Sequence, residues 1–326
     1  MPILTRVSAE SAPVHLLLIA PTKMGKSTYA AQAVLDGFNV IYVDADNGLS
    51  ALRHHLRNDR AAWERVNYFS PRAPLAFVHR LLKSNDSNPL VWSPTEDKPY
   101  VVSLQNPLPD DTPLWVMSAK SIPPSYVLVI DSWSSLAADA LNLLHAGQSS
   151  TLLSGESDQS LYGEASAMLG YIANVLQGIQ CHVIVQAHPT MYEVYEKPPG
   201  VQNPKQKDMI LKEVIKVPVS SSRGHGLDLG RRFNHIGHLE VNNLSQVIVD
   251  FTREKNRVGG GPPNRKDTAD KLSFRALVEA GFGSLPSTQP VESGWYRETT
   301  VGEWNQALAD RRKQQAATAS TLPGKK

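Results

Sequence analysis

Three consecutive residues near the start of the chain, Gly25-Lys26-Ser27, have the types and order of a phosphate-binding loop. The glycine lets backbone N–H groups curve around phosphate oxygens, the lysine reaches the β- and γ-phosphates, and the serine hydroxyl ligates Mg²⁺. ATP and Mg²⁺ are therefore the expected cofactors. The residues predicted to bind the nucleotide are those of the loop and its flanks: Pro21, Thr22, Lys23, Met24, Gly25, Lys26, Ser27 and Thr28.

The residues on either side of this loop must position it. The apolar run Leu16–Ile19 predicts a buried strand, and helix-forming residues follow the loop as far as Leu35, with Gly37 placed as a C-terminal cap. One position departs from the pattern G-x-x-x-x-G-K-[ST], because Ala20 stands where the first glycine is expected. The alternative interpretation is an ordinary strand and helix joined by a polar turn.

Two acidic residues at the ends of later apolar runs complete the predicted chemistry. Asp131 closes the run that begins at Tyr126 and is expected to hold Mg²⁺ together with Ser27. Asp46 follows another strand and is the candidate general base that orients the attacking water. Both aspartates also suit the alternative role of capping the helix that follows, and Asp44 competes with Asp46 for either role.

Gln186 and His188 end a further apolar strand, where either side chain is able to sense the γ-phosphate. The alternative for both is hydrogen bonding that terminates the strand. The catalytic residues predicted from the sequence are Lys26, Asp46, Asp131 and Gln186.

Apolar strands alternate with helical segments through most of the chain, which predicts an α/β fold with a mostly parallel sheet flanked by helices. From residue 236 the pattern alternates between apolar and polar residues, which indicates antiparallel strands toward the C-terminus. In such sheets, ligands bind beyond the C-terminal ends of the strands. The phosphate loop, Asp46, Asp131 and Gln186 are all expected at that edge.

The predicted organisation is one ATPase domain over residues 1–285, followed by a polar C-terminal tail over residues 286–326. Within the domain, residues 84–125 contain eight prolines and are interpreted as a surface insertion. Two short runs in it, Tyr100–Leu104 and Leu114–Met117, are candidates for a small hairpin.

The composition is that of a soluble globular protein, with 41% hydrophobic and 20% charged residues in 326. The longest apolar runs have the length of a strand, so no membrane partner is expected. A single cysteine, Cys181, excludes an internal disulfide framework, and no signal peptide is recognisable, which together favour a cytoplasmic location. The net charge of +2 does not by itself indicate a nucleic-acid partner.

The order of the motifs GKS, VDAD, VIDS and VIVQAH resembles the RecA-like P-loop ATPases, and most closely the small phage-encoded recombination ATPases that act beside single-strand annealing or binding proteins. The resemblance implies that Asp46 is the catalytic base, although RecA has glutamate there. It implies that Asp131 is the Walker B acid and that Gln186 couples ATP to a DNA-binding loop. The proline-rich insertion is foreign to RecA.

The same resemblance implies a homo-oligomer in which two loops, His145–Leu161 and Pro189–Gly226, bind single-stranded DNA. The second loop mixes lysines with tyrosines, as sequence-tolerant single-strand binding requires; the alternative is a solvated charged loop. The DNA-binding candidates are Lys205, Lys207 and Arg223. Lys255 and Arg257 are candidates for a cation that acts on the nucleotide of a neighbouring subunit, or for a charged hairpin end.

The leading hypothesis is thus an ATP-dependent ATPase that binds single-stranded DNA in phage-type recombination or replication. Its expected protein partner is a single-strand binding or annealing protein. The main alternative is a nucleotide-dependent switch or loader that acts on a protein without binding DNA. A third hypothesis, a small-molecule phosphotransferase, lacks a recognisable lid and acceptor pocket in the sequence.

Overall fold

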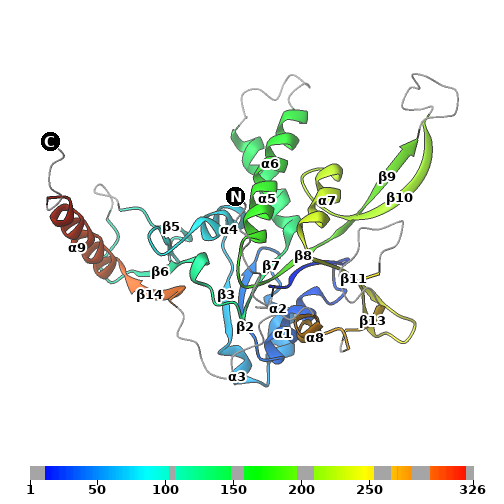
Figure 1. Cartoon of the computed structure of the whole chain (residues 1–326), viewed down its shortest axis with the longest axis horizontal. Helices are drawn as coiled ribbons and strands as arrows, with labels where there is room; N and C mark the ends of the chain where they lie inside the picture. The colour runs from blue at the N-terminus through cyan, green and yellow to red at the C-terminus, as the bar shows by residue number, and fades with distance from the viewer. Residues whose placement is uncertain are drawn as a thin grey trace, which may run out of the picture. The chain divides into compact units, whose positions relative to one another are not determined.

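The computed structural model describes residues 12–102, 107–147, 158–196, 209–252, 266–269, 271–280 and 294–320 (Figure 1). The chain divides into two compact units. The first comprises Met1–Val78 and Pro123–Val291, and the second comprises His79–Ile122 and Glu292–Lys326.

An eight-stranded sheet organises the first unit, with strand order β13-β12-β11-β1-β8-β7-β2-β3. Its six parallel strands are β1 (His15–Ile19), β2 (Asn39–Asp44), β3 (Val66–Phe69), β7 (Tyr126–Asp131), β8 (His182–Ala187) and β11 (His235–Val241). Two strands, β12 (Val247–Asp250) and β13 (Lys266–Thr268), extend the sheet in antiparallel fashion. The predicted α/β class, with antiparallel strands toward the C-terminus, is confirmed.

The central strands form because their sequences are continuous apolar runs, which suit a sheet that is covered on both faces. Every residue of β1, β7 and β8 is buried. On one face, Leu16 and Leu18 of β1 pack in a cluster with Ala30 and Val34 of the helix that follows the phosphate loop. This burial fixes the height and direction of that helix above the sheet.

The helices of the first unit connect these strands. They are α1 (Lys26–Leu35), α2 (Leu49–Leu56), α3 (Arg60–Trp63), α5 (Trp133–Gly147), α6 (Asp158–Gln177), α7 (Arg223–Leu229) with the short η3 (Gly230–Arg232), and α8 (Phe274–Ala280). The helix α4 (Pro74–Lys83) spans the boundary between the two units. Gly37 adopts a φ of 98° just beyond α1, as the sequence predicts for a helix-terminating glycine.

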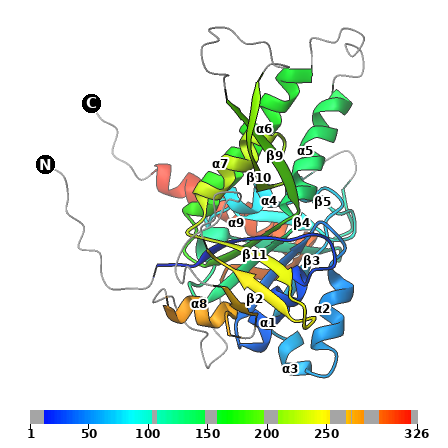
Figure 2. The ribbon, with the colours of Figure 1, turned by 90° about the vertical axis from the view of Figure 1, so that its right-hand side faces the viewer.

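The segment that the sequence presents as one long loop, Pro189–Gly226, is largely a β-hairpin, so this prediction was wrong. Its strands β9 (Pro189–Glu196) and β10 (Ile210–Pro218) pair in antiparallel fashion, and α7 follows them. The prolines at both ends of the hairpin and the lysines within it favour a loop in the sequence, but Val217 at the base of the hairpin is fully buried. Figures 1 and 2 show the hairpin extending away from the eight-stranded sheet.

The second unit is built from two distant parts of the chain. Its antiparallel sheet has the order β14-β6-β4-β5, with strands β4 (Leu90–Ser93), β5 (Lys98–Pro99), β6 (Pro113–Met117) and β14 (Tyr296–Thr300). The short helix η1 (Ala119–Ser121) follows β6, and α9 (Val301–Ser320) follows β14. The proline-rich segment and the C-terminal segment therefore share one sheet.

The small hairpin expected within the proline-rich segment is a further correction. The strand β6 pairs with β4 on one side and with β14 on the other. Apolar side chains explain this arrangement, because Leu114 and Val116 of β6 form a cluster with Val301 and Trp304 of α9. Tyr100 lies outside any strand, and residues 103–106 are outside the described part of the chain.

Among the described residues, no helix is both long enough and apolar enough to cross a bilayer.

Candidate nucleotide-binding site

The phosphate loop has the backbone geometry that its sequence predicts. Gly25 is the N-cap of α1 with a φ of 90°, a conformation that glycine adopts without strain. Lys23 also has a positive φ, of 64°. The loop therefore turns tightly and leaves the first backbone N–H groups of α1 without helical partners, which is the arrangement that binds phosphate oxygens.

The side chain of Lys26 is enclosed by its own loop. It is only 7% exposed, and its Nζ donates hydrogen bonds to the carbonyl oxygens of Ala20 at 2.9 Å and Pro21 at 3.1 Å. Burial lowers the pKa of this ammonium group, against the opposing attraction of Asp131 and Asp46. A buried cation whose hydrogen-bond partners include no carboxylate suits an anionic ligand at the same position.

Ala20 replaces the first glycine of the motif without visible conflict. It is buried, its N–H donates to the carbonyl oxygen of Ala187 at 3.0 Å, and it is not among the residues with positive φ. Since this position extends the pairing of β1 with β8, an alanine is tolerated here.

The remaining loop residues lie at the surface. Pro21, Thr22 and Lys23 are exposed, Met24 is half-buried, and the hydroxyl of Thr28 lies 2.8 Å from His55 Nε2 of α2. Thr28, which was predicted to contact the nucleotide, is therefore engaged with α2 in this structure.

The predicted metal ligands are adjacent. Ser27 Oγ donates to Asp131 Oδ2 at 2.9 Å, and the Tyr42 hydroxyl donates to the same carboxylate oxygen. Burial raises the pKa of Asp131, the two hydrogen bonds lower it, and the nearby Asp44 and Asp46 raise it further, with a net upward shift. A cation bound beside this carboxylate would favour its ionised form.

The donor set fits Mg²⁺, which takes oxygen ligands and keeps several water molecules. Gly48 provides the space: a Cβ atom added there would lie 2.5 Å from Asp131 Oδ2, 3.0 Å from the Tyr42 hydroxyl and 3.3 Å from Ser27 Oγ. Only glycine leaves room beside these three oxygens. No local signal in the sequence marks Gly48, because its importance depends on a contact between distant segments.

The structure separates the roles of Asp44 and Asp46. Asp44 accepts hydrogen bonds from the backbone N–H groups of Asp46, Gly48 and Leu49, and from the Tyr68 hydroxyl, so it holds the turn that leads into α2. Asp46 caps no helix. Its carboxylate instead meets residues from two other strand ends.

Asp46 lies at the centre of a polar network. It accepts hydrogen bonds from Ser135 Oγ at 2.6 Å and Ser132 Oγ at 3.2 Å, and its Oδ2 lies 3.0 Å from His188 Nε2. Partial burial raises the pKa of Asp46, but the hydrogen bonds from Ser135, His188 and Ser132 outweigh it and lower the pKa overall. Asp46 is consequently a carboxylate that is charged and well oriented.

His188 connects Asp46 to the phosphate loop. Its Nδ1 lies 3.3 Å from Lys26 Nζ, and because an ammonium group has no acceptor, Nδ1 must accept this bond. The other nitrogen, Nε2, then carries the proton and donates to Asp46. His188 is a candidate γ-phosphate sensor in the sequence and is not among the predicted catalytic residues, whereas the structure places it between two of them.

Gln186 lies below this network. It registers beside Asp131 on β7 and Leu18 on β1, is 0% exposed, and its amide makes no hydrogen bond with any described residue. The structure thus does not bring Gln186 into contact with Lys26 or Asp46. An unpaired buried amide two residues before His188 leaves polar groups available to a rearranged state.

Hydrogen bonds also connect this edge of the sheet to the base of the hairpin. The N–H of His188 donates to Ser134 Oγ at 2.9 Å, and β9 begins at the next residue. Trp133 Nε1 donates to Ser220 Oγ at 3.1 Å, just beyond β10. Movement of residues 132–135 would therefore be transmitted to the base of both strands of the hairpin.

Most of the predicted DNA-binding and intersubunit residues lie outside the described part of the chain. This applies to Lys205, Lys207, Lys255 and Arg257. Arg223 is the first residue of α7, and its side chain is not described. The loop predicted at His145–Leu161 is described only at its flanks, in α5 and α6.

No protein-family model and no curated protein matches this sequence. Among solved structures, the chain is similar to the RadB recombinase, with 15% identity and a TM-score of 0.35 over 74% of this chain and 81% of that one. It is also similar to the flagellar accessory protein FlaH from Methanocaldococcus jannaschii, with 10% identity and a TM-score of 0.35 over 79% and 84%. Both likenesses are distant.

Proposed function

We propose that this chain is a RecA-like, Mg²⁺-dependent ATPase that acts on single-stranded DNA as a homo-oligomer in phage-type recombination or replication. The observation that carries the proposal is the convergence of Lys26, His188 and Asp46 beside the Ser27–Asp131 pair. Asp46, Asp131 and His188 come from the ends of three strands, and Lys26 and Ser27 come from the phosphate loop that follows a fourth.

Each residue has a distinct role in ATP hydrolysis. The N–H groups at the start of α1 and the Lys26 ammonium hold the phosphates, and Lys26 exchanges its loop carbonyls for phosphate oxygens. Ser27 and Asp131 would hold Mg²⁺, which neutralises charge on the phosphates when it is bound. Asp46 accepts a hydrogen bond from the attacking water and orients it toward the γ-phosphorus atom.

His188 is placed to report the presence of the γ-phosphate. A phosphate oxygen that binds Lys26 competes with His188 Nδ1 for the same ammonium group. His188 lies immediately before β9. Its release from Lys26 would therefore transmit the state of the nucleotide to the hairpin. We assign the binding of single-stranded DNA to the segment that joins β9 to β10, which contains Lys197, Lys205 and Lys207.

ATP hydrolysis with and without oligothymidylate tests this proposal. We expect DNA to raise the rate several-fold, and Lys26→Ala to lower it by roughly 100-fold or more because it removes a charge that stabilises the transition state. Lys271→Ala, at an exposed lysine paired with Asp267, is the matched control. DNA affinity should fall steeply with added salt, since phosphate contacts release counterions.

Turnover by the unchanged chain that ignores DNA would contradict the DNA assignment and leave the ATPase assignment standing. Full turnover by Lys26→Ala would contradict the assignment of ATP hydrolysis to the phosphate loop.

A second candidate function, a nucleotide-dependent switch or loader that binds a protein, is favoured by the described strands of the hairpin. Their exposed apolar side chains are Met191, Tyr195, Ile210, Leu211 and Val214. Lys212 of β10 is paired with Glu196 at 3.4 Å, and a second acid of β9, Glu193, registers opposite Val214. Such a surface suits a protein better than a phosphate backbone. Co-sedimentation with DNA at low salt distinguishes the two functions.

A further inference from the structure

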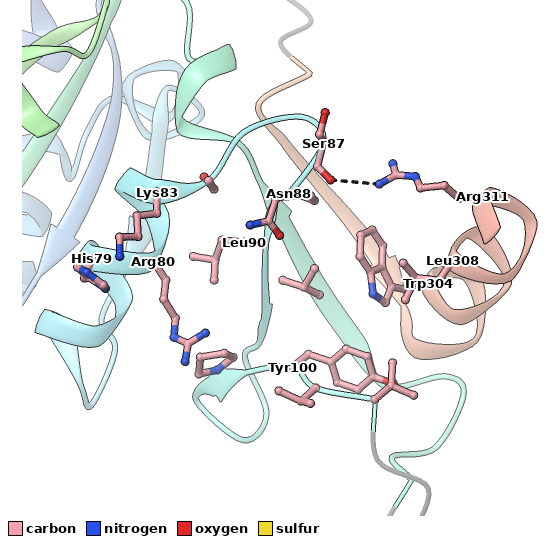
Figure 3. A pocket seen from close by; sticks show the side chains of 16 residues that line it. His79, Arg80, Lys83, Ser87, Asn88, Leu90, Tyr100, Trp304, Leu308 and Arg311 are labelled. Atoms are coloured by element: carbon pink, nitrogen blue, oxygen red, sulfur yellow. Dashed lines mark hydrogen bonds between the residues drawn. The ribbon is translucent and has the colours of Figure 1, made fainter. Parts of the chain in front are cut away.

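The second unit contains a cavity of about 660 Å³ (Figure 3). Residues of α4, β4, α9 and the segment around Tyr100 line it, and all of them belong to this unit. Figure 3 shows Arg80 and Lys83 on the α4 side, Trp304, Leu308 and Arg311 on the α9 side, and Leu90 between them. The cavity is large enough for one or two amino-acid side chains or a small organic ligand.

The charge on the cavity wall has one sign. Arg80, Lys83 and Arg311 line it from two helices, and the described lining residues include no aspartate or glutamate. These positive charges also act on His79, whose pKa is lowered first by burial and then by the neighbouring charges of Lys83 and Arg80. A concave surface with cations on opposite sides attracts a ligand that carries several negative charges.

Within the described part of the chain, one hydrogen bond of Arg311 is observed. Its Nη1 donates to the carbonyl oxygen of Ser87 at 3.4 Å, which is a long bond and uses one of five N–H donors. The remaining donors have the planar geometry that pairs with a carboxylate through two parallel hydrogen bonds. Its exposed position at the cavity leaves this fork accessible.

Part of the wall is apolar. Aliphatic side chains and prolines contribute to it, and Ser84, Ser87 and Asn88 add polar groups; the apolar residues are Leu90, Val91, Val101, Val102, Leu308, Pro89 and Pro99. Val101 and Val102 are 74% and 48% exposed, so apolar surface is available to a ligand. Burial of that surface would favour an apolar group on the ligand by the hydrophobic effect.

We propose that this cavity binds an acidic peptide segment of a partner protein, in which two or three carboxylates adjoin one large apolar side chain. The apolar side chain occupies the aliphatic floor beside Leu90 and Val102. The carboxylates pair with Arg311 on one side and with Arg80 and Lys83 on the other. This site is separate from the ATPase assignment and does not depend on it.

A peptide fits the wall better than a nucleic acid does. Nucleic-acid bases require an exposed aromatic face for stacking, but Trp304 is only 8% exposed and packs in the core of the unit. The other aromatic residue, Tyr100, is half-buried and its hydroxyl donates to Asn305 Oδ1 at 3.3 Å. The aliphatic side chains and prolines of the wall accommodate aliphatic or aromatic side chains of a peptide.

Fluorescence anisotropy with the full chain tests the proposal. The probe is a fluorescein-labelled peptide of three aspartates followed by leucine and phenylalanine, and two further peptides replace either the aspartates by asparagine or the apolar pair by alanine. We expect saturable binding of the first peptide and at least roughly tenfold weaker binding of the other two, because one lacks the carboxylates and the other lacks the large apolar side chains.

Arg311→Glu and Arg312→Glu form a matched pair of variants. Both arginines are exposed on α9, and only Arg311 lines the cavity. We expect Arg311→Glu to weaken binding by roughly tenfold or more and Arg312→Glu to change it by less than about twofold. Thermal unfolding checks that both variants are folded, and Val102→Asp provides an independent change of the cavity wall.

Three results would overturn the proposal. The first is equal weakening by the two arginine variants, which would show attraction to general surface charge. The second is binding of labelled oligothymidylate, but not of the peptide, with sensitivity to Arg311→Glu. The third is the absence of saturable peptide binding by the unchanged chain.

Discussion

Cations are presented in opposite ways in the two units. In the first unit, Lys26 is almost completely buried, bonded to two carbonyl oxygens and close to Asp131 and Asp46. In the second unit, Arg80, Lys83 and Arg311 are exposed around an aliphatic cavity whose described lining lacks carboxylates. A buried, oriented cation stabilises one arrangement of charge, whereas exposed flexible cations accept ligands of varied shape.

The comparison has an energetic consequence. Removing a member of a buried polar network leaves its partners unpaired and is costly, whereas removing an exposed charge loses an attraction that water and salt already weaken. Removing the charge of Asp46 from the network of the first unit should therefore have a larger effect than the tenfold weakening expected for Arg311. Three predictions test this difference.

The largest effect is expected for Asp46→Asn. The change removes the carboxylate that orients the attacking water and should lower the rate of ATP hydrolysis by about 100-fold or more. Nucleotide binding should remain, because Lys26 and the start of α1 are unchanged. Steady-state turnover and a fluorescent ATP analogue measure the two properties, with Glu64→Gln at an exposed acid as the control. Turnover within about threefold of the unchanged chain would rule out Asp46 as this group.

An intermediate effect is expected for Gly48→Ala. The new Cβ would lie 2.5 Å from Asp131 Oδ2, so the carboxylate must move and the metal site is disturbed. We expect the Mg²⁺ concentration that supports half-maximal turnover to rise by roughly tenfold. Gly163→Ala is the matched control, because a Cβ there meets nothing within 4 Å. An unchanged Mg²⁺ requirement would place the metal elsewhere.

The smallest effect is expected for Ser135→Ala, and it should depend on pH. The hydrogen bond from Ser135 helps to hold the pKa of Asp46 below its ordinary value, so its loss raises that pKa. Asp46 then becomes protonated at a higher pH, and the acidic limb of the rate profile moves upward. At neutral pH the loss should not exceed about tenfold.

The control for this profile is Ser50→Ala, at an exposed serine of α2. An acidic limb that stays in place in Ser135→Ala would show that the profile reports a group other than Asp46.

The two sheets differ in how far the sequence predicts them. The strands of the parallel sheet are continuous apolar runs such as β1 and β7, and each is recognisable by itself because both faces are buried. The second sheet joins β6 to β14 across 180 residues of sequence, and its strands are short and half-exposed. No local pattern identifies such a pairing, because its partner is distant along the chain.

The candidate site shows the same limit at the scale of single residues. The local motif Gly25-Lys26-Ser27 predicts its own conformation, since glycine geometry and the following helix are encoded nearby. The local sequence does not determine which of Asp44 and Asp46 is the candidate general base. It depends on which side chain faces the turn into α2 and which faces His188, 142 residues away.

By itself, the sequence determined the α/β class, the position of the phosphate loop and the strand ends that carry its acids, because each follows from residues that are adjacent along the chain. Only the tertiary structure decided that His188 rather than Gln186 meets Lys26, that Gly48 must lack a side chain, and that α4 and α9 enclose one cationic cavity. These features are contacts between distant segments, and their geometry exists only after the core has packed.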